Sequence, residues 1–424
     1  MSNISSMSHD ELLSIKKELQ AEYDRFVKAG KKLDISRGKP GNDQLILSKE
    51  LLNLPGDAPT FVDGVEAANY GVLEGLPSAR KLFSEILGTK PEQVFIGGSS
   101  SLSMMFDTIS KAFTHGLLHS EKPWSKLDKV KFICVVPGYD RHFAICESFG
   151  IEMIPVLLLD DGPDMNMVYE LIKDESVRGM WCVPKYSNPD GVSYSDETVR
   201  KIAAMKPAAK DFLLMWDNAY CIHEFDGEFV PFLDILSECE KHGNADMVFE
   251  FASTSKITFP GAGISCFACS EANMAYMKKI ISKQIISYDK LNQLRHMLFF
   301  KNREGIMAHM KKLGAVLKPK FDVVLNALNE EIGPHHIANW YKPKGGYFVS
   351  LYTMAGTAKR ISELCKGAGL VITPAGATYP YGNDPNDSHL RIAPSYPPID
   401  ELKEAMKLLC CCIKLAAVEK LLAE

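Results

Sequence analysis

The sequence predicts an α/β protein, with a larger domain built on a mostly parallel central sheet and a smaller α+β domain. Up to about residue 270, short apolar runs typical of buried strands alternate with segments of helical periodicity. After that point long helical patterns dominate, followed by a few strand-like runs. The length of 424 residues is long for one hydrophobic core, which favours two domains. We expect residues 51–300 to form the large domain, residues 301–424 the small domain, and residues 1–50 a helix and loop that pack on the small domain.

The first helix is indicated by a capping box. Ser8 can cap it, Glu11 lies three residues further on, and apolar residues then recur at helical spacing. Gly30 is a natural end for this helix. The glycine-rich stretch at residues 35–41, which includes Gly38, is too irregular for a strand or a helix interior, so it is either a plain connector or part of a site.

Five apolar runs predict the main strands of the sheet, and each is followed directly by polar or aromatic groups. The runs lie at residues 93–96, 131–136, 179–183, 212–216 and 247–251. The groups that follow them are Ser99 with Ser100 and Ser101, Tyr139, Asn188, Asp217 with Tyr220, and Ser253 with Lys256. Because parallel sheets bind ligands beyond the carboxyl ends of their strands, the sequence predicts that these groups face one crevice.

The residues after the first run suit a phosphate group. Gly98, Ser99, Ser100 and Ser101 precede an amphipathic helical pattern, and free N–H groups at a helix start bind phosphate together with hydroxyls. A serine-rich cap and turn is the alternative interpretation. Tyr139 could stack on a planar ring or pack as an ordinary core aromatic residue.

Charged and amide groups further along the chain indicate chemistry. Lys256 follows an apolar run and several hydroxyl residues; desolvation there would free its amine to attack a carbonyl, while an ordinary turn lysine is the alternative. An unpaired carboxylate at the end of an apolar strand is costly, so Asp217 either caps a backbone group or pairs with a cation such as a protonated pyridine. Arg391 could hold a carboxylate bidentately or form a structural ion pair. Asn188, in Asn-Pro-Asp-Gly, favours a turn.

In their joint order, these residues resemble the fold-type I pyridoxal-phosphate enzymes, specifically the class I aminotransferases. The resemblance extends from about Gly38 to Arg391, and its most specific parts are Asp217-x-x-Tyr220, Ser253-x-x-Lys256 and Asn188-Pro189-x-Gly191. Within that family the sequence is most similar to the aspartate-aminotransferase-like subgroup Ic. Residues 36–40, 253–263, 292–296 and 391–395 carry this similarity.

The resemblance implies pyridoxal 5′-phosphate (PLP) as the cofactor and a role for each matching residue. Lys256 would attach the cofactor and move the substrate proton, Asp217 would pair with the pyridine N–H⁺, and Tyr139 would stack on the ring. Asn188 and Tyr220 would contact the phenolic oxygen of the cofactor. Its phosphate would be bound by Ser99, Ser100, Ser101 and Ser253. Arg391 would bind the substrate α-carboxylate, which the backbone of Gly38 would also approach. Tyr70 matches a tyrosine that reaches the phosphate of the neighbouring subunit's cofactor, which implies a homodimer with shared active sites.

One stretch departs from the family pattern. The family usually places an arginine shortly after the lysine, in a Gly-x-Arg-x-Gly context, to bind the phosphate. Residues 261–265 read Gly-Ala-Gly-Ile-Ser here, without an arginine. Either another cation replaces it, with Arg295 and Lys290 as candidates, or backbone amides and hydroxyls hold the phosphate.

The leading functional hypothesis is amino transfer between an L-amino acid and a 2-oxo acid by a ping-pong route. Arg37, Lys39 and Arg295 lie in segments expected near the site, and a second cation there would suit an acidic substrate such as aspartate or glutamate. A PLP-dependent lyase or decarboxylase on the same fold is the alternative.

Other classes of protein fit less well. No G-x-G-x-x-G fingerprint opens a helix, as a nicotinamide-dependent dehydrogenase requires, and no basic helix-turn-helix segment precedes residue 36, as an amino-acid-sensing regulator would have. A net charge of −5 favours neither nucleic acid nor an anionic membrane as a partner. The eleven cysteines include one Cys-x-x-Cys, formed by Cys266 and Cys269, and no second pair of this spacing, so we expect free thiols, no metal site and a cytoplasmic protein.

Overall fold

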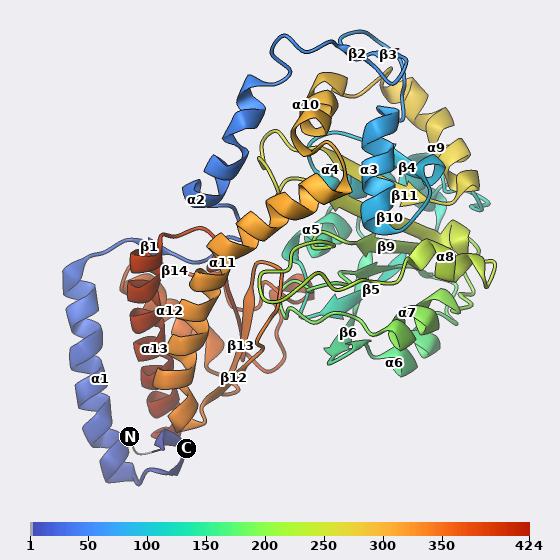
Figure 1. Ribbon diagram of the computed structural model, residues 1–424. Coiled ribbons are helices and arrows are strands. Elements are labelled where there is room, and N and C mark those ends of the chain that lie inside the picture. The colour runs from blue at the N-terminus through green and yellow to red at the C-terminus, as the bar shows by residue number, and fades with distance from the viewer. Residues whose placement is uncertain (1–2) are drawn as a thin grey trace.

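All five predicted strand runs lie in one eight-stranded sheet of the computed structural model, which describes residues 3–424 (Figure 1). The strand order is β4-β11-β10-β9-β8-β5-β6-β7, and only β11 and β7 run against the other strands. Their bounds are β4 (Val94–Ile96), β5 (Lys131–Val136), β6 (Glu152–Leu159), β7 (Gly162–Pro163), β8 (Val177–Cys182), β9 (Leu213–Asp217), β10 (Val248–Ser253) and β11 (Ser265–Cys269). The predicted α/β fold with a mostly parallel sheet is confirmed.

Strand β6 is absent from the predicted set for a physical reason. Its side chains alternate irregularly between buried and exposed, so it lacks the continuous apolar run of its neighbours. Pro155, inside the strand, also argues against a strand in sequence. The proline is tolerated because β7 pairs only with the last two residues of β6, which leaves the edge at Pro155 without a partner strand.

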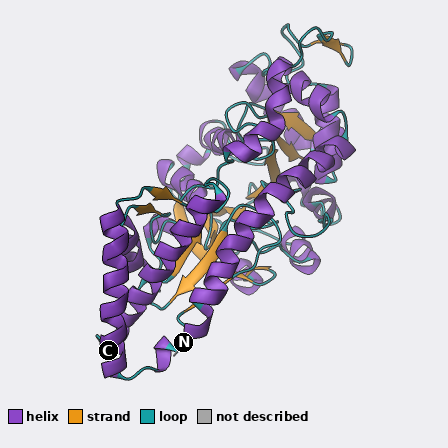
Figure 2. Ribbon diagram, turned by 60° about the vertical axis from the view of Figure 1, so that its left-hand side comes forward, coloured by secondary structure: helices purple, strands orange, loops and turns teal. Residues whose placement is uncertain are grey.

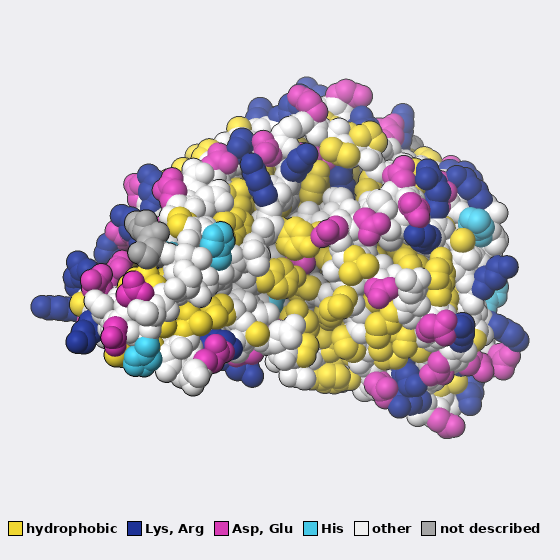
Figure 3. Space-filling model, turned by 90° about the horizontal axis from the view of Figure 1, so that it is seen from below, with side chains coloured by type: hydrophobic (Ala, Val, Ile, Leu, Met, Phe, Trp, Pro, Cys, Tyr) yellow, Lys and Arg dark blue, Asp and Glu magenta, His cyan; other side chains and the backbone are white. Residues whose placement is uncertain are grey.

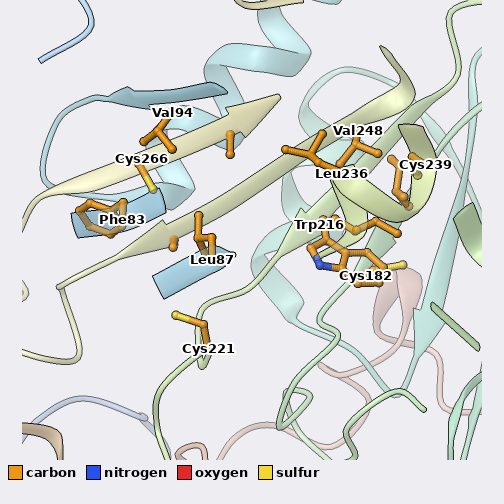
Figure 4. Packing of buried hydrophobic residues seen from close by; sticks show 14 of the residues in the cluster. Phe83, Leu87, Val94, Cys182, Trp216, Cys221, Leu236, Cys239, Val248 and Cys266 are labelled. Carbon is orange, nitrogen blue, oxygen red and sulfur yellow. The ribbon is translucent and has the colours of Figure 1, made fainter. Parts of the chain in front are cut away.

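Alternate side chains of the central strands enter two separate apolar clusters, one on each face of the sheet. On β10, Val248 and Ala252 join one cluster, while Phe249 and Phe251 join the other. Figure 4 shows part of the first cluster, in which Trp216 of β9 lies near Val248. The helices around the sheet are α3 (Pro77–Leu87), α4 (Ser101–Thr114), α5 (Asp140–Ser148), α6 (Met165–Leu171), α7 (Asp196–Ala203), α8 (Ile235–Glu240), α9 (Glu271–Gln284) and α10 (Lys290–Phe300).

A third apolar cluster joins the C-terminal part of the chain to its N-terminal helix. Leu12 and Leu19 of the first helix are buried in it together with Leu409 and Ile413 of the last. The elements of this body are α1 (His9–Ala29), α12 (Ala358–Gly367), α13 (Ile399–Leu421), a three-stranded antiparallel sheet of β12 (Ala338–Trp340), β13 (Val349–Thr353) and β15 (His389–Ile392), and a parallel pair of β1 (Leu33–Asp34) and β14 (Leu370–Val371). The C-terminal end of the chain lies on this body (Figure 2).

The long helix α11 (Arg303–Glu331) connects the two bodies (Figure 1). Ile306 and Met310, near its start, are buried in a cluster of the eight-stranded sheet, whereas Leu317 and Phe321 are buried in the C-terminal cluster. The expected domain boundary at residue 301 therefore coincides with the start of a helix that serves both cores. Short elements complete the chain, with α2 (Asn42–Leu45) and the hairpin of β2 (Phe61–Val62) and β3 (Val65–Glu66) preceding α3.

The predicted capping box of α1 is present. The Ser8 N–H donates to Glu11 Oε2 at 2.7 Å, the Glu11 N–H donates to Ser8 Oγ at 3.5 Å, and Gly30 ends the helix with φ of +59°. None of the helices in residues 3–424 has the length and apolar character needed to cross a bilayer. Acidic and basic side chains are interspersed over the face seen in Figure 3.

Candidate active site

A cavity of about 1020 Å³ lies where the carboxyl ends of the central strands meet the C-terminal body. Of the predicted site residues, Gly38, Tyr139, Asn188, Asp217, Tyr220, Lys256 and Arg391 line it. These residues come from both apolar bodies and from segments more than 350 positions apart in sequence (391 − 38 = 353). The structure therefore brings the predicted amine, carboxylate, aromatic and guanidinium groups into one cavity.

Lys256 faces this cavity with a free amine. It follows β10 by three residues in a turn, and its side chain is half-buried. Desolvation by the surrounding protein lowers the pKa of Lys256, and the nearby Asp217 carboxylate opposes this shift only in part. Its Nζ lies 4.9 Å from the centre of the Tyr220 ring and has no hydrogen-bond partner among the described residues. A neutral, unengaged amine is the form of lysine that attacks a carbonyl.

Asp217, the last residue of β9, is held on one side and open on the other. Its Oδ2 lies 3.0 Å from His142 Nε2, while its buried Oδ1 has no hydrogen-bond partner in the described part of the chain. His142 in turn stacks on Trp181, with ring centres 4.1 Å apart and planes within 9°. A buried carboxylate oxygen without a partner is costly, so a cationic N–H donor placed in the cavity would satisfy it.

Sequence reasoning missed His142 and Trp181. One signal for His142 was available, because it stands three residues after Tyr139 at the start of a helix, where both side chains lie on the same side. Trp181 comes from β8, and only the fold brings it under the imidazole. Burial, with Asp217 next in effect, raises the pKa of Tyr139 to about 12, so its phenol stays protonated.

The predicted phosphate ligands gather beside the cavity, not among its lining residues. Ser100 is the N-cap of α4, and its side chain makes no capping hydrogen bond to the helix. The loop before it is held by Ser265, which donates to Gly98 O through its N–H at 2.9 Å and its Oγ at 2.7 Å. Ser253 is the strand partner of Ser265, and its Oγ lies 2.8 Å from Ser255 Oγ. Hydroxyl groups thus surround the start of β11, with Ser99 in the same loop and Ser101 as the first residue of α4.

The two candidate replacements for the family's phosphate-binding arginine are engaged elsewhere. Arg295 Nε donates to Leu54 O at 2.7 Å, and Lys290 Nζ donates to Asn69 O at 2.6 Å. Neither residue lines the cavity. Asn292 instead holds the arginine-free loop, because its Nδ2 lies 3.0 Å from the carbonyl oxygens of Ala262 and Gly263.

Arg391, in β15, is buried and lines the cavity. Its Nε donates to Thr373 Oγ1 at 3.3 Å, and its Nη1 donates to Asp140 Oδ1 at 3.0 Å and to Asn188 Oδ1 at 3.2 Å. The guanidinium also lies 4.7 Å from the centre of the Phe348 ring. The sequence identified the arginine and Asn188, but it gave no sign of Asp140, Thr373 or Phe348, which come from three other segments.

Gly38 is required by close packing over the cavity. A Cβ at this position would lie 2.4 Å from Cζ of the buried Phe348, so any other residue would force the ring or the backbone to shift. Glycine therefore lets the backbone of the N-terminal segment approach the cavity next to Arg391. Tyr220 is also buried, and burial raises its pKa far above the ordinary value.

A hydrogen-bond network behind Lys256 also escaped sequence analysis. The hydroxyl of Tyr347 lies 3.1 Å from Lys256 O and 3.0 Å from Gln44 Oε1. The Gln44 amide donates to Ser395 O at 2.7 Å, and the Ser395 hydroxyl donates to Lys39 O at 3.0 Å. The main chain of Lys256 is thereby tied to the N-terminal segment and to the loop that follows Arg391.

Tyr70 lies outside this arrangement. Its side chain is 78% exposed and does not line the cavity of its own chain.

These residues fit PLP. The open Oδ1 of Asp217 matches a protonated pyridine nitrogen, the free amine of Lys256 matches an aldehyde, and the hydroxyl-rich loop before α4 matches a phosphate.

Comparison with known proteins agrees with this chemistry. The family model described as aspartate amino-transferase matches residues 7–424. An aspartate aminotransferase of Corynebacterium glutamicum is 44% identical over 403 residues, which cover 95% of this chain and 93% of that protein. A crystal structure of an aspartate transaminase from Corynebacterium glutamicum superposes with a TM-score of 0.96 at 42% identity and covers 99% of both chains.

A more distant structure shares the fold alone. The α-aminoadipate aminotransferase LysN of Thermus thermophilus, complexed with N-(5′-phosphopyridoxyl)-L-leucine, has a TM-score of 0.70 at 20% identity over 98% of this chain and 100% of that one. The fold and the reaction class that the sequence resemblance implies are thus confirmed. Matched along nearly its whole length, this chain belongs to the aspartate aminotransferase family of PLP-dependent, fold-type I aminotransferases.

Proposed function

We propose that this aminotransferase holds PLP on Lys256 and moves the amino group of an acidic L-amino acid, such as aspartate or glutamate, to a 2-oxo acid. One observation carries the assignment of the site. Lys256 Nζ and Asp217 Oδ1 face the same cavity, and neither has a hydrogen-bond partner in residues 3–424. The buried Asp217 oxygen is costly without a ligand, and it and the half-buried amine stand open where a pyridinium and an aldehyde would bind.

PLP, when bound, supplies an electron sink for the charge that develops at the substrate α-carbon. Asp217 keeps its carboxylate on the ring nitrogen because His142 fixes the other oxygen. Lys256, with its lowered pKa, takes up the proton of the α-carbon and returns it at the next step. Arg391 binds the α-carboxylate that substrate and product share, so the donor and then the acceptor use one site in turn. The Asn188 amide and Tyr220 hydroxyl are the donors next to the phenolic oxygen.

The charge of the residues that line the cavity supports an acidic substrate. Arg37, Lys39 and Arg141 line it in addition to Arg391, and neither Arg37 nor Arg141 forms an ion pair with another described residue. Lys39 lies over the Tyr396 ring, with Nζ 3.8 Å from its centre. Uncompensated cations near a bound amino acid favour a side chain that carries a second carboxylate. From the sequence we expect Arg295 near the site, but Arg295 does not line the cavity, whereas Arg141 does.

We further propose a homodimer in which Tyr70 reaches the cofactor phosphate of the neighbouring subunit. Tyr70 is 78% exposed, and other large apolar side chains in the same part of the chain, Ile46, Leu52 and Phe61, are also exposed by more than 60%. Such a group of exposed apolar side chains suits a subunit interface. All eleven cysteines are free and buried, which supports a cytoplasmic location.

A half-reaction screen tests the proposed activity. Purified holoenzyme is mixed with one amino acid at a time, and the absorbance of the cofactor is followed as it passes to its amine form. We expect aspartate or glutamate to give the fastest conversion, and Lys256→Ala to give none. If no amino acid changes the spectrum, the proposal is wrong. Release of pyruvate or another oxo acid with full turnover in the absence of any acceptor would assign the protein to the lyases instead.

A further inference from the structure

The guanidinium of Arg391 is already occupied by an acid of the same chain. Asp140, the first residue of α5, places Oδ1 3.0 Å from Arg391 Nη1, and the amide oxygen of Asn188 lies 3.2 Å from the same nitrogen. Nε is taken by Thr373 at 3.3 Å. Only Nη2 has no hydrogen-bond partner in the part of the chain that the structure describes.

This occupancy conflicts with binding of a substrate carboxylate. A carboxylate that is held bidentately needs two neighbouring nitrogens of the guanidinium, either Nη1 with Nη2 or Nε with Nη2. Each of these edges has one nitrogen already in use. On the first edge a substrate carboxylate would also meet the negative charge of Asp140, and like charges at that separation repel each other. One of the present contacts of Arg391 therefore has to give way.

Of the contacts of Arg391, the one with Asp140 is the easiest to break. Asn188 is 5% exposed and stands in a tight Asn-Pro-Asp-Gly turn, so its amide is fixed. The side chain of Asp140 is 35% exposed, against 8% for Arg391, and lies at a helix N-terminus, which stabilises a carboxylate in other orientations as well. Arg37 and Arg141 line the same cavity and make no ion pair among the described residues, so a displaced Asp140 would stay near cations.

We propose that Asp140 is a built-in competitor for Arg391, which occupies the α-carboxylate site in the empty enzyme and is displaced by each substrate. This inference rests on the proposed function, in which Arg391 binds the α-carboxylate. Asp140 keeps the buried guanidinium charge compensated between turnovers and lowers the affinity of the site for every carboxylate. Small monocarboxylates, which gain few other contacts, are the ligands that it excludes most effectively.

The substitution Asp140→Asn tests this proposal in the holoenzyme. It preserves the size of the side chain and an oxygen acceptor for Arg391 while removing the competing charge. We expect the KM for aspartate and the dissociation constant for succinate, measured from the cofactor spectrum, both to fall three- to tenfold. Acetate should inhibit the variant at least fivefold more strongly than the parent enzyme.

Asp34→Asn is the matched control. Asp34 also lines the cavity, but its carboxylate accepts hydrogen bonds from Ser36 and has no contact with Arg391. We expect its removal to change these constants less than twofold, because only the general field of the cavity changes. If Asp140→Asn and Asp34→Asn strengthen carboxylate binding by the same factor, the effect comes from net charge alone and the proposal is wrong.

The opposite result identifies a different role. If Asp140→Asn weakens succinate and acetate binding while the cofactor loads normally, Asp140 orients Arg391 and does not compete with the substrate, so the proposal is wrong. A failure of the proposed function looks different, because then the parent enzyme shows no spectral response to aspartate at all.

Discussion

The reactivity that we propose for Lys256 comes from its surroundings. The lysine sits in a cavity wall where burial lowers its pKa, and the nearby Asp217, whose Oδ2 lies 3.0 Å from His142 Nε2, opposes this shift only in part. The sequence was sufficient to single out these two charged residues, because each directly follows or ends an apolar strand. It was not sufficient to find Asp140 or Thr373, whose contacts with Arg391 depend on three segments that meet only in the fold.

Removing the charge of Asp217 should slow the reaction far more than it weakens cofactor binding. Asp217→Asn keeps an oxygen near His142 but no longer stabilises a protonated pyridine nitrogen. We expect kcat to fall by about 10²–10³, the usual effect of removing one electrostatic contact at a reacting centre. The measurement is the rate of the half-reaction with aspartate at saturating cofactor. A variant that retains most of its rate would exclude this role for Asp217.

Glu250 gives a prediction for the dependence of stability on pH. It lies on β10, where Asn218 Nδ2 donates to its Oε1 at 2.8 Å and its Oε2 has no partner among the described residues. Burial, followed by the nearby Asp234, raises the pKa of Glu250 from 4.5 to about 8. Between these values the folded protein holds a proton that the unfolded chain releases, so the free energy of unfolding falls as pH rises through this window.

Glu250→Gln removes this pH dependence and retains the acceptor for Asn218. We expect the variant to exceed the parent protein in stability at pH 8 by on the order of 3 kcal/mol and to match it near pH 5. Urea unfolding at the two pH values measures both differences. If the two proteins differ equally at both pH values, Glu250 does not hold the additional proton.

At the scale of elements, the site depends on strand ends that the sequence indicated and on long-range contacts that it did not. A continuous apolar run marks each of β4, β5, β8, β9 and β10, and the polar residues that follow each run lie in or beside the cavity. Tyr347 lies 91 positions from Lys256, and Gln44 lies 303 positions from Tyr347. A hydrogen bond between residues so far apart in sequence leaves no periodic pattern from which it could be predicted.

Tyr347 should support catalysis through the main chain of Lys256. Tyr347→Phe removes the single phenolic hydrogen that the carbonyl of Lys256 and the Gln44 oxygen share in a buried place, at a cost of about 1–3 kcal/mol in stability. We expect kcat to fall roughly three- to tenfold, with KM for aspartate little changed, because Arg391 is not disturbed.

Tyr276→Phe is the matched control for this prediction. Its hydroxyl donates to Gly116 O at 2.9 Å, far from the cavity lining. This variant should lose stability without losing kcat. Equal kinetic effects of the two substitutions would show that Tyr347 acts only through general stability.

On the scale of the whole molecule, α11 joins the two domains because its start and its later turns are buried in different apolar cores. We propose three parts of the chain: an N-terminal helix and loop at residues 1–50, a large domain at residues 51–300 and a small domain at residues 301–424. Leu12 and Leu19 of α1 are buried with α13, whereas the first turns of α11 are buried with the eight-stranded sheet. The composition of the chain could indicate two domains but not this shared helix, because its apolar positions look alike along its length.

The proposed dimer makes a prediction that separates shared from independent active sites. Tyr70→Phe should lower the cofactor affinity several-fold without changing the dimer mass seen in sedimentation. Mixed dimers of this variant with Lys256→Ala should then contain one site with both Lys256 and Tyr70 intact, and that site should bind the cofactor with the affinity of the parent enzyme. If the defect persists in the mixed dimers, Tyr70 acts within its own chain.

The most direct test of the account is the chemical state of Lys256 in the resting holoenzyme. Borohydride reduction followed by peptide mapping should fix the pyridoxyl group, in a one-to-one ratio with the chain, on the peptide that carries Lys256 and on no other lysine. A label on another lysine, or no label in an enzyme that remains active, would contradict the assignment of this cavity as the active site.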